Sequence, residues 1–173
     1  MRIISGRARG TKLYTLEGEN TRPTLDRVKE SLFNIIQNKI EDANFLDLFS
    51  GSGAIGLEAL SRGAKKTIFC DSSKQAIEII NKNIKKTHLE DNSKVYNLDY
   101  KKALKEIKEK QDIIYIDPPY KTDFAIQAIN EIIKLNIIET DDKEIIENIE
   151  KLEIEIQDKR KYGRAYLIFL NRR

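Results

Sequence analysis

The 173-residue chain has only one cysteine and three prolines, and it has no long apolar segment. Its one cysteine, Cys70, allows no internal disulfide, so a reducing cytoplasm is the expected compartment. No apolar run approaches the roughly 20 residues of a membrane span, and the first residues lack the apolar core of a signal peptide. These absences predict a soluble cytoplasmic protein in which Cys70, inside an apolar run, is buried and inert.

Histidine is equally scarce. The only one, His88, follows a predicted helix, and no group of potential metal ligands surrounds it in the sequence. We therefore expect His88 at the surface and predict no metal site.

Charge is nearly balanced, at a net +3, but the basic residues gather at the two ends. Residues 158–173 contain six basic residues and one acid, and residues 1–12 contain no acid and four basic residues, Arg2, Arg7, Arg9 and Lys12. Such ends can attract phosphate, although a solvated surface is the simpler interpretation of charge alone.

Short apolar runs alternate with helical patterns along most of the chain. The runs predict strands at 45–49, 67–70, 95–98 and 112–116, and an antiparallel hairpin at 152–156 and 165–170. Apolar residues at helical spacing predict helices ending near 40, over 54–60, after Ser72 or Ser73, over 101–110 and over 125–135. We predict one α/β domain over 1–173 with a parallel sheet, preceded within it by a small hairpin extension, 1–20.

Acids mark the carboxyl ends of the four predicted parallel strands, where ligands bind in such sheets. They are Asp47, Asp71, Asp99 and Asp117. This register predicts that one site lies along that edge of the sheet.

A glycine turn follows the first of these strands. Gly51, Gly53 and Gly56 form G-x-G-x-x-G between strand and helix, with Asp71 about 20 residues on to bind a ribose. NAD and S-adenosylmethionine (SAM) both suit this pattern. Asp47, four residues before Gly51, favours SAM, because a carboxylate attracts the cationic methionine end and repels a pyrophosphate.

Two of the three prolines stand together in Asp117-Pro118-Pro119-Tyr120, where the 112–116 run ends. Prolines donate no hydrogen bond, so this stiff corner presents acceptors, the Asp117 carboxylate and the Pro118 carbonyl. These acceptors could orient the amine of a nucleobase while Tyr120 stacks on its ring. A strand-ending turn with a buried tyrosine is the structural alternative.

Asp117-Pro118-Pro119-Tyr120 resembles the catalytic motif of amino-group methyltransferases. The segments 2–6, 22–34, 46–53, 56–64 and 161–164 resemble the signatures of the RsmD family, so the resemblance covers nearly the whole chain. It implies a class I SAM-dependent methyltransferase fold, Rossmann-like, with a seven-stranded, mostly parallel sheet and an added N-terminal hairpin. It also implies methylation of a guanine N2 in 16S ribosomal RNA.

Roles carry over from the family residue by residue. The resemblance implies that Asp117, Pro118, Pro119 and Tyr120 hold the target base. The cofactor contacts that it implies are Arg22, Pro23, Thr24, Asp47, Phe49, Ser50, Gly51, Gly53, Asp71, Asp99 and Tyr100. The RNA contacts that it implies are Ser5, Gly6, Arg7, Arg9 and Lys12, and the partner is 16S rRNA within the small ribosomal subunit or an assembly intermediate, bound by a monomer.

The chain departs from the family in two places. Asp71 stands where the family usually has Glu, and 135–139 leaves room only for a stunted fifth strand. Two other functions stay open, an amino-methyltransferase for adenine or cytosine in DNA and a non-catalytic RNA-binding assembly factor.

Overall fold

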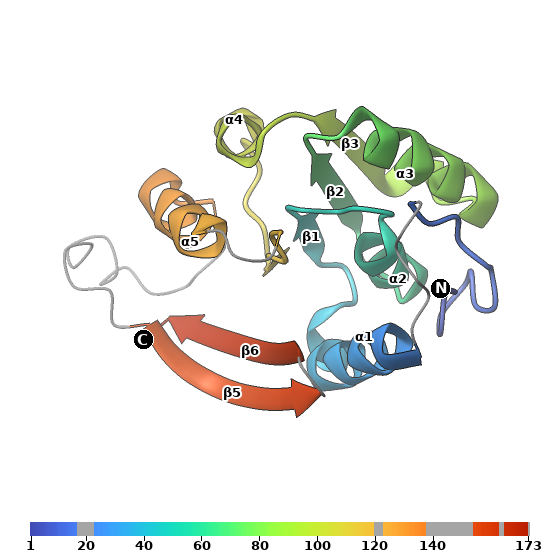
Figure 1. Cartoon of the computed structure of the whole chain (residues 1–173), viewed down its shortest axis with the longest axis horizontal. Coiled ribbons are helices and arrows are strands. Elements are labelled where there is room, and N and C mark those ends of the chain that lie inside the picture. Colours follow the sequence, from blue (N-terminus) through green and yellow to red (C-terminus); the bar gives the residue numbers. More distant parts are fainter. Residues whose placement is uncertain (17–22, 120–122, 138–153, 163–164, 173) are drawn as a thin grey trace.

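The computed structural model describes residues 1–16, 23–119, 123–137, 154–162 and 165–172. Four parallel strands form its central sheet (Figure 1) in the order β3-β2-β1-β4. They are β1 (Asn44–Asp47), β2 (Lys66–Asp71), β3 (Ser93–Asn97) and β4 (Ile113–Tyr115). The chain moves outward from β1 to β3 and returns on the other side of β1, so the strand order reverses between β1 and β4. Such a switch point leaves a crevice at the carboxyl ends of the strands.

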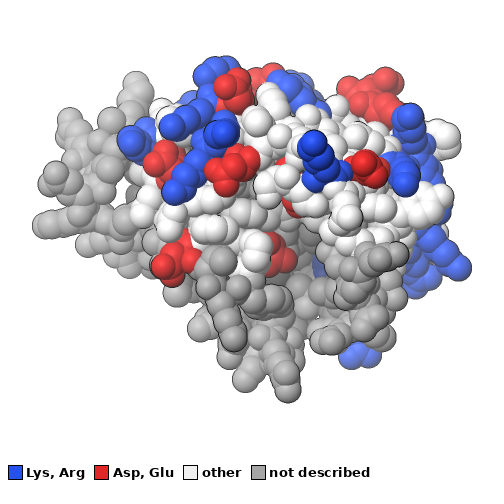
Figure 2. Space-filling model, turned by 45° about the horizontal axis from the view of Figure 1, so that its top comes forward, with Lys and Arg blue, Asp and Glu red and all other residues white. Residues whose placement is uncertain are grey.

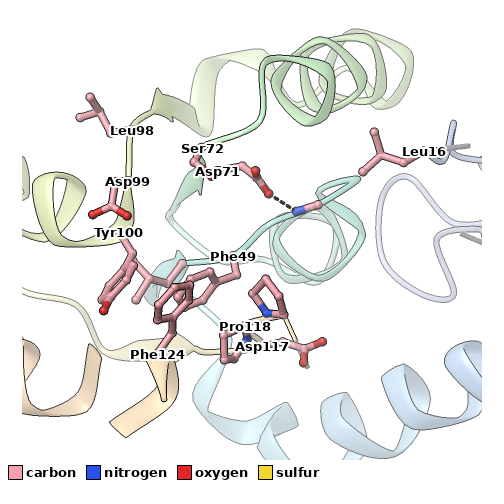
Figure 3. Close-up of a pocket in the computed structure, with 13 residues that line it drawn as sticks. Leu16, Phe49, Asp71, Ser72, Leu98, Asp99, Tyr100, Asp117, Pro118 and Phe124 are labelled. Atoms are coloured by element: carbon pink, nitrogen blue, oxygen red, sulfur yellow. Dashed lines mark hydrogen bonds between the residues drawn. The ribbon is translucent and has the colours of Figure 1, made fainter. Parts of the chain in front are cut away.

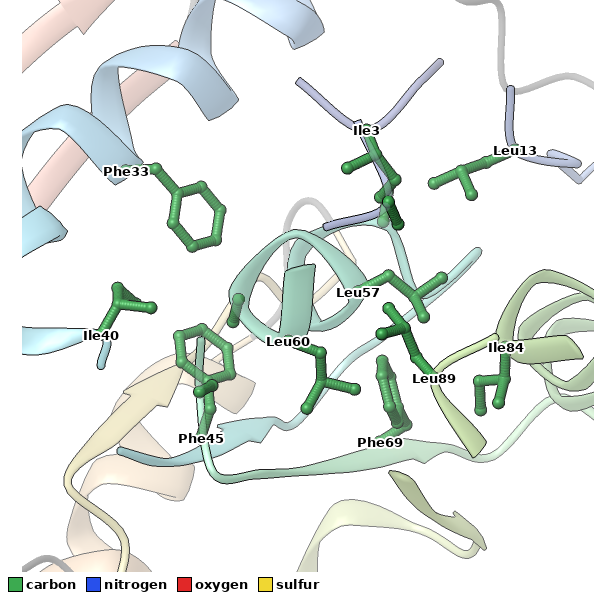
Figure 4. Packing of buried hydrophobic residues seen from close by; sticks show 14 of the residues in the cluster. Ile3, Leu13, Phe33, Ile40, Phe45, Leu57, Leu60, Phe69, Ile84 and Leu89 are labelled. Carbon is green, nitrogen blue, oxygen red and sulfur yellow. The ribbon is translucent and has the colours of Figure 1, made fainter. Parts of the chain in front are cut away.

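Helices cover both faces of this sheet. The helices are α1 (Pro23–Ile36), α2 (Ala54–Ser61), α3 (Lys74–Thr87), α4 (Tyr100–Glu106) and α5 (Phe124–Leu135), with short 3-10 turns η1 (Gln37–Lys39) and η2 (Glu90–Asn92). Successive strand residues point to opposite faces. Phe45 and Phe69 therefore pack in a core cluster with residues of α1, α2 and α3 (Figure 4), while Leu46 and Ile68 pack in a second cluster with residues of α4 and α5.

The N-terminal residues pair as a small antiparallel hairpin through one bridge, Arg2 with Lys12. Ile3 and Leu13 from its two arms are buried in the same cluster as α2 and α3. The hairpin is thus part of the folded domain, because its apolar side chains complete the core over those helices.

At the other end, β5 (Ile154–Tyr162) and β6 (Ala165–Arg172) pair antiparallel, as predicted, but β5 runs on to Tyr162 instead of ending at 156, and the pair forms a two-stranded sheet of its own. The described residues therefore contain four parallel and two antiparallel strands. The rest of the predicted seven-stranded sheet is not confirmed, because the expected fifth strand falls at 138 and beyond, outside the described residues.

The predicted helix over 101–110 is too long, since α4 ends at Glu106. The next residue, Ile107, takes an extended conformation and is buried in the cluster with Leu104. Burying this isoleucine turns the chain toward the sheet, which the charged pattern alone did not show. Within the described part of the chain, no helix is long and apolar enough to cross a bilayer.

Candidate active site

A pocket of about 360 Å³ opens at the carboxyl ends of the parallel strands (Figure 3), a volume typical of small-molecule sites. Each of the four strands contributes to it through the residues that follow or end it. Its wall is formed by Leu16, Leu48, Phe49, Gly51, Asp71, Ser72, Leu98, Asp99, Tyr100, Asp117, Pro118, Pro119 and Phe124. The predicted convergence of acids at this edge is confirmed for three of them, Asp71, Asp99 and Asp117.

The glycine turn has the backbone geometry that its sequence predicts. Gly51 and Gly53 have φ of 52° and 78°, and Gly53 is the N-cap residue of α2. These left-handed conformations favour glycine over any residue with a side chain. At Gly56, an added Cβ would clash with the Phe69 ring, so α2 and β2 pack closely at a position where only glycine fits.

Asp47 lies beneath this turn with 1% of its surface exposed. Its Oδ2 accepts from the Gly56 N–H at 3.1 Å, while its Oδ1 is buried with no hydrogen-bond partner. Burial raises the pKa of this carboxyl to about 7, the Gly56 N–H opposes the rise, and the charges of Asp117 and Asp71 add to it. A bound cation near these three acids would therefore be stabilised, and it would favour the charged form of Asp47.

Asp71 joins the glycine turn to the start of α3. Its Oδ2 accepts from the Gly51 N–H at 2.9 Å and its Oδ1 from the Ser73 N–H at 2.8 Å. Asp99 instead caps α4, with Oδ1 accepting from the Lys101 N–H at 3.0 Å. Both carboxylates face the pocket from fixed positions, and a ribose hydroxyl would share the Asp71 oxygens with these N–H groups.

The proline corner borders the same pocket, beside the glycine turn. Figure 3 shows Asp117 and Pro118 on one side of Phe49, and Asp99 with Tyr100 on the other. Partial burial raises the pKa of the Asp117 carboxyl, and the Tyr115 hydroxyl, 3.4 Å from its Oδ2, opposes the rise. The side chain nevertheless remains exposed and can reach a ligand from solvent.

Three aromatic rings form the floor between these two sides. The Phe49 and Tyr100 centroids lie 5.3 Å apart, the Tyr100 and Phe124 centroids 5.4 Å apart. Phe124 is 37% exposed and lines the pocket, although no motif in the sequence marks it as a site residue. Its position at the start of α5, directly after the proline corner, was the available signal, because that helix begins at the same edge of the sheet.

Other predicted cofactor residues lie behind the wall of the pocket. Ser50 braces the two central strands, since its hydroxyl donates to the Asp47 carbonyl at 2.7 Å and accepts from the Cys70 N–H at 3.0 Å. Gly53 is buried within the turn. Arg22 and Tyr120 lie outside the residues that the structure describes. Pro23 and Thr24 begin α1, but the structure describes only their backbone.

The predicted RNA residues divide by position. Ser5 and Gly6 dock on α2, where the Ser5 N–H donates to Glu58 at 3.0 Å and an added Cβ on Gly6 would overlap the Ser61 carbonyl. Arg7, Arg9 and Lys12 are exposed. The first two residues thus fix the hairpin, and the three basic ones are open to solvent.

Cys70 and His88 occupy the places predicted for them. Cys70 is fully buried, which raises the pKa of its thiol to about 12, and His88 is exposed in the left-handed turn that ends α3. Among the residues that the structure describes, no three His, Cys, Asp or Glu side chains could together hold a metal ion.

The pocket fits SAM by the chemistry of its donors and acceptors. The Asp47 carboxyl lies beneath the glycine turn and not in the pocket wall, so it could attract a methionine ammonium only from behind that turn. Asp71 could hold a ribose, while Leu98, Tyr100 and Phe124 offer apolar surface to an adenine. Four acids near one site would oppose the pyrophosphate of a dinucleotide.

Comparison with known proteins agrees with this chemistry. The family model described as Conserved hypothetical protein 95 matches residues 1–171. Ribosomal RNA small subunit methyltransferase D of Haemophilus influenzae is 40% identical over 135 residues, covering 75% of this chain and 69% of that protein. The chain belongs to the RsmD family.

A Bacillus subtilis relative, named "Putative rRNA methyltransferase YlbH", is 37% identical over 157 residues, which are 89% of this chain and 85% of that protein. The solved structure described as "Putative methyltransferase yhhF" from Escherichia coli superposes with a TM-score of 0.82 at 28% identity, covering 98% of this chain and 97% of that one. The RsmD-family chain thus has the class I SAM methyltransferase fold.

Proposed function

We propose that this chain transfers a methyl group from SAM to the exocyclic N2 amine of a guanine in 16S ribosomal RNA. Membership of the RsmD family supports methylation of ribosomal RNA as the class of reaction. The choice of guanine N2, the small subunit or its assembly intermediate as substrate, the cytoplasm and the monomeric state are the finer parts of the proposal.

One observation carries the proposal. The corner at Asp117 and Pro118 and the turn at Gly51 line a single pocket, at the point where the strand order reverses. Methylation of a weakly nucleophilic amine requires hydrogen-bond acceptors that orient the amine, placed beside the site that binds the cationic cofactor.

When bound, SAM supplies an electrophilic methyl group on a sulfonium. The chain's part is alignment, since the reaction is a direct displacement that depends on proximity and orientation. The Asp117 carboxylate and the Pro118 carbonyl would accept the N–H groups of the base, which turns the nitrogen lone pair toward the methyl group. Asp117 can accept from both N1–H and N2–H of guanine, whereas adenine presents an acceptor at N1.

The amine becomes acidic only after it has gained the methyl group. Asp117 then lies within reach of the released proton and can pass it to solvent, to which its side chain is exposed. Its raised pKa aids this step, because a more basic carboxylate accepts a proton more readily.

The experiment is to incubate the protein with methyl-labelled SAM and 16S rRNA, free and within small subunits, and then to identify the labelled nucleoside. The expected product is N2-methylguanosine. Label in N6-methyladenosine would overturn the choice of base, and no label in either substrate would overturn the function.

A further inference from the structure

Tyr14 is one of the few large apolar side chains that the described surface leaves open, with 49% of its area exposed. Its backbone is nevertheless held on both sides by one side chain. The Tyr14 N–H donates to Asn83 Oδ1 at 2.8 Å, and Asn83 Nδ2 donates to the Tyr14 carbonyl at 2.9 Å. An exposed aromatic ring on a fixed backbone presents a binding surface at little cost in conformational entropy.

The Asn83 side chain also links the Tyr14 backbone to the glycine turn at the pocket. Asn83 is fully buried, and its Nδ2 donates a second hydrogen bond to the carbonyl of Ser52, within the glycine turn, at 2.9 Å. Leu16, two residues after Tyr14, lines the pocket, so the two backbones are at most about 7 Å apart along the chain. The backbone of Tyr14 is therefore close to the wall of the candidate active site.

Basic side chains surround this ring. The Lys86 ammonium lies 4.4 Å from the centre of the Tyr14 ring. Lys82, one turn earlier on α3, shares that side of the helix, because residues four apart align; Lys85, about 60° from Lys82 and about 100° from Lys86, lies at the border of this row. The one acid within α3 is Glu78, one further turn toward the start of the helix.

The hairpin extends the same positive surface. Its exposed Arg7, Arg9 and Lys12 precede Tyr14, and residues 1–16 contain no acid. Figure 2 shows Lys and Arg side chains gathered along the right-hand edge of the molecule, the side on which α3 and the N-terminal residues lie in Figure 1. A phosphate backbone is complementary in charge to such an edge.

We infer that Tyr14, Lys82 and Lys86 form a platform for an unpaired RNA nucleotide that flanks the target base. The base stacks on the exposed part of the Tyr14 ring, and Lys82 and Lys86 contact the neighbouring phosphates. Stacking on an aromatic ring together with lysine contacts is a general way of holding single-stranded nucleic acid. The inference rests on the proposed function and assigns to its substrate a surface on α3 beyond the hairpin.

The test measures the KM for 16S rRNA substrate and the salt dependence of RNA binding for single variants. Tyr14→Ala should raise KM by about fivefold to a hundredfold, from the usual strength of base stacking, and Tyr14→Phe should restore it. Lys82→Gln and Lys86→Gln should each reduce the slope of log Kd against log salt by about 0.7, the value for one contact to a single-stranded phosphate. Lys105→Gln, with the same charge change at an exposed position of α4 on the opposite face of the sheet, is the matched control and should alter neither quantity.

Binding of SAM, measured by calorimetry, and the melting temperature should stay unchanged in all these variants, which separates loss of RNA contact from loss of structure. Equal slopes for Lys82→Gln, Lys86→Gln and Lys105→Gln, or an unchanged KM in Tyr14→Ala, would overturn the platform while the wild-type protein still methylates RNA. A wild-type protein that methylates no RNA would instead overturn the proposed function, and the platform with it.

Discussion

Glu58 is the charge on which the docking of the N-terminal hairpin most depends, and Glu58→Gln is the change that tests it. The carboxylate is fully buried on α2. Its Oε2 accepts from the Ile4 N–H at 2.8 Å and lies 3.2 Å from Lys29 Nζ; its Oε1 accepts from the Ser5 N–H at 3.0 Å and from Arg62 Nε at 2.8 Å. One group thus joins the hairpin, α1 and α2.

The size of the effect follows from burial. Lys29 is only 2% exposed, and burial lowers the pKa of its amine, while Glu58 opposes this shift. Glutamine would present an NH₂ group to two of the four donors and leave Lys29 charged without its partner. Removing one member of a buried ion pair costs about 3–5 kcal/mol, which lowers the melting temperature of a chain of this size by about 6–20 °C.

The assay is urea and thermal unfolding followed by circular dichroism. Glu109→Gln is the matched control, because Glu109 pairs with Lys66 at 2.7 Å but is 53% exposed, and an exposed pair contributes about 1 kcal/mol or less. Adding Lys29→Met to Glu58→Gln should recover part of the loss, since it removes the stranded charge. A loss of stability in Glu58→Gln no greater than that in Glu109→Gln would contradict this role of Glu58.

Three further changes test other parts of the structure. Because the pKa of Asp47 is raised to about 7, the native state keeps a proton that the unfolded chain releases near pH 4, so the free energy of unfolding should fall as pH rises between these values. Asp47→Asn should flatten this fall in urea titrations. A pH profile unaltered by Asp47→Asn would contradict the raised pKa. Gly56→Ala should cost about 1–3 kcal/mol in the same assay, because its methyl group overlaps the Phe69 ring, and a neutral result would show that α2 can move. Gly6→Ala, which meets the Ser61 carbonyl at a φ of 82°, should release the hairpin and speed proteolysis there; protection equal to wild type would argue against close docking.

Much of the fold could be predicted because its signals are local. β-Branched and aromatic runs marked β1 to β4, and Ser73 was one of two expected caps of α3, where its hydroxyl accepts from the Ala76 N–H at 3.3 Å. The alternation of strands and helices gave the parallel sheet. Strand ends then located the acids of the pocket, since all carboxyl ends of a parallel sheet meet at one edge.

What could not be predicted depends on contacts between distant residues. Glu58 looked like an ordinary helix residue, and only the docked hairpin, more than 50 residues earlier, explains its burial. Asn83 likewise gave no local signal, although it links Tyr14 to Ser52. Ile107 ended α4 early because a buried position in the core outweighed the helical pattern around it.

The central claim is that the Asp117 carboxylate orients the amine that receives the methyl group. The most direct measurement is kcat for methyl transfer to 16S rRNA by Asp117→Ala, beside Asp123→Ala, an exposed acid that makes no side-chain cap at the start of α5. The account predicts that Asp117→Ala loses about a hundredfold or more in kcat while its Kd for SAM stays within about threefold of wild type, as for other fixed groups that act on the reacting atoms. Undiminished kcat in Asp117→Ala, or an equal loss in Asp123→Ala, would contradict it.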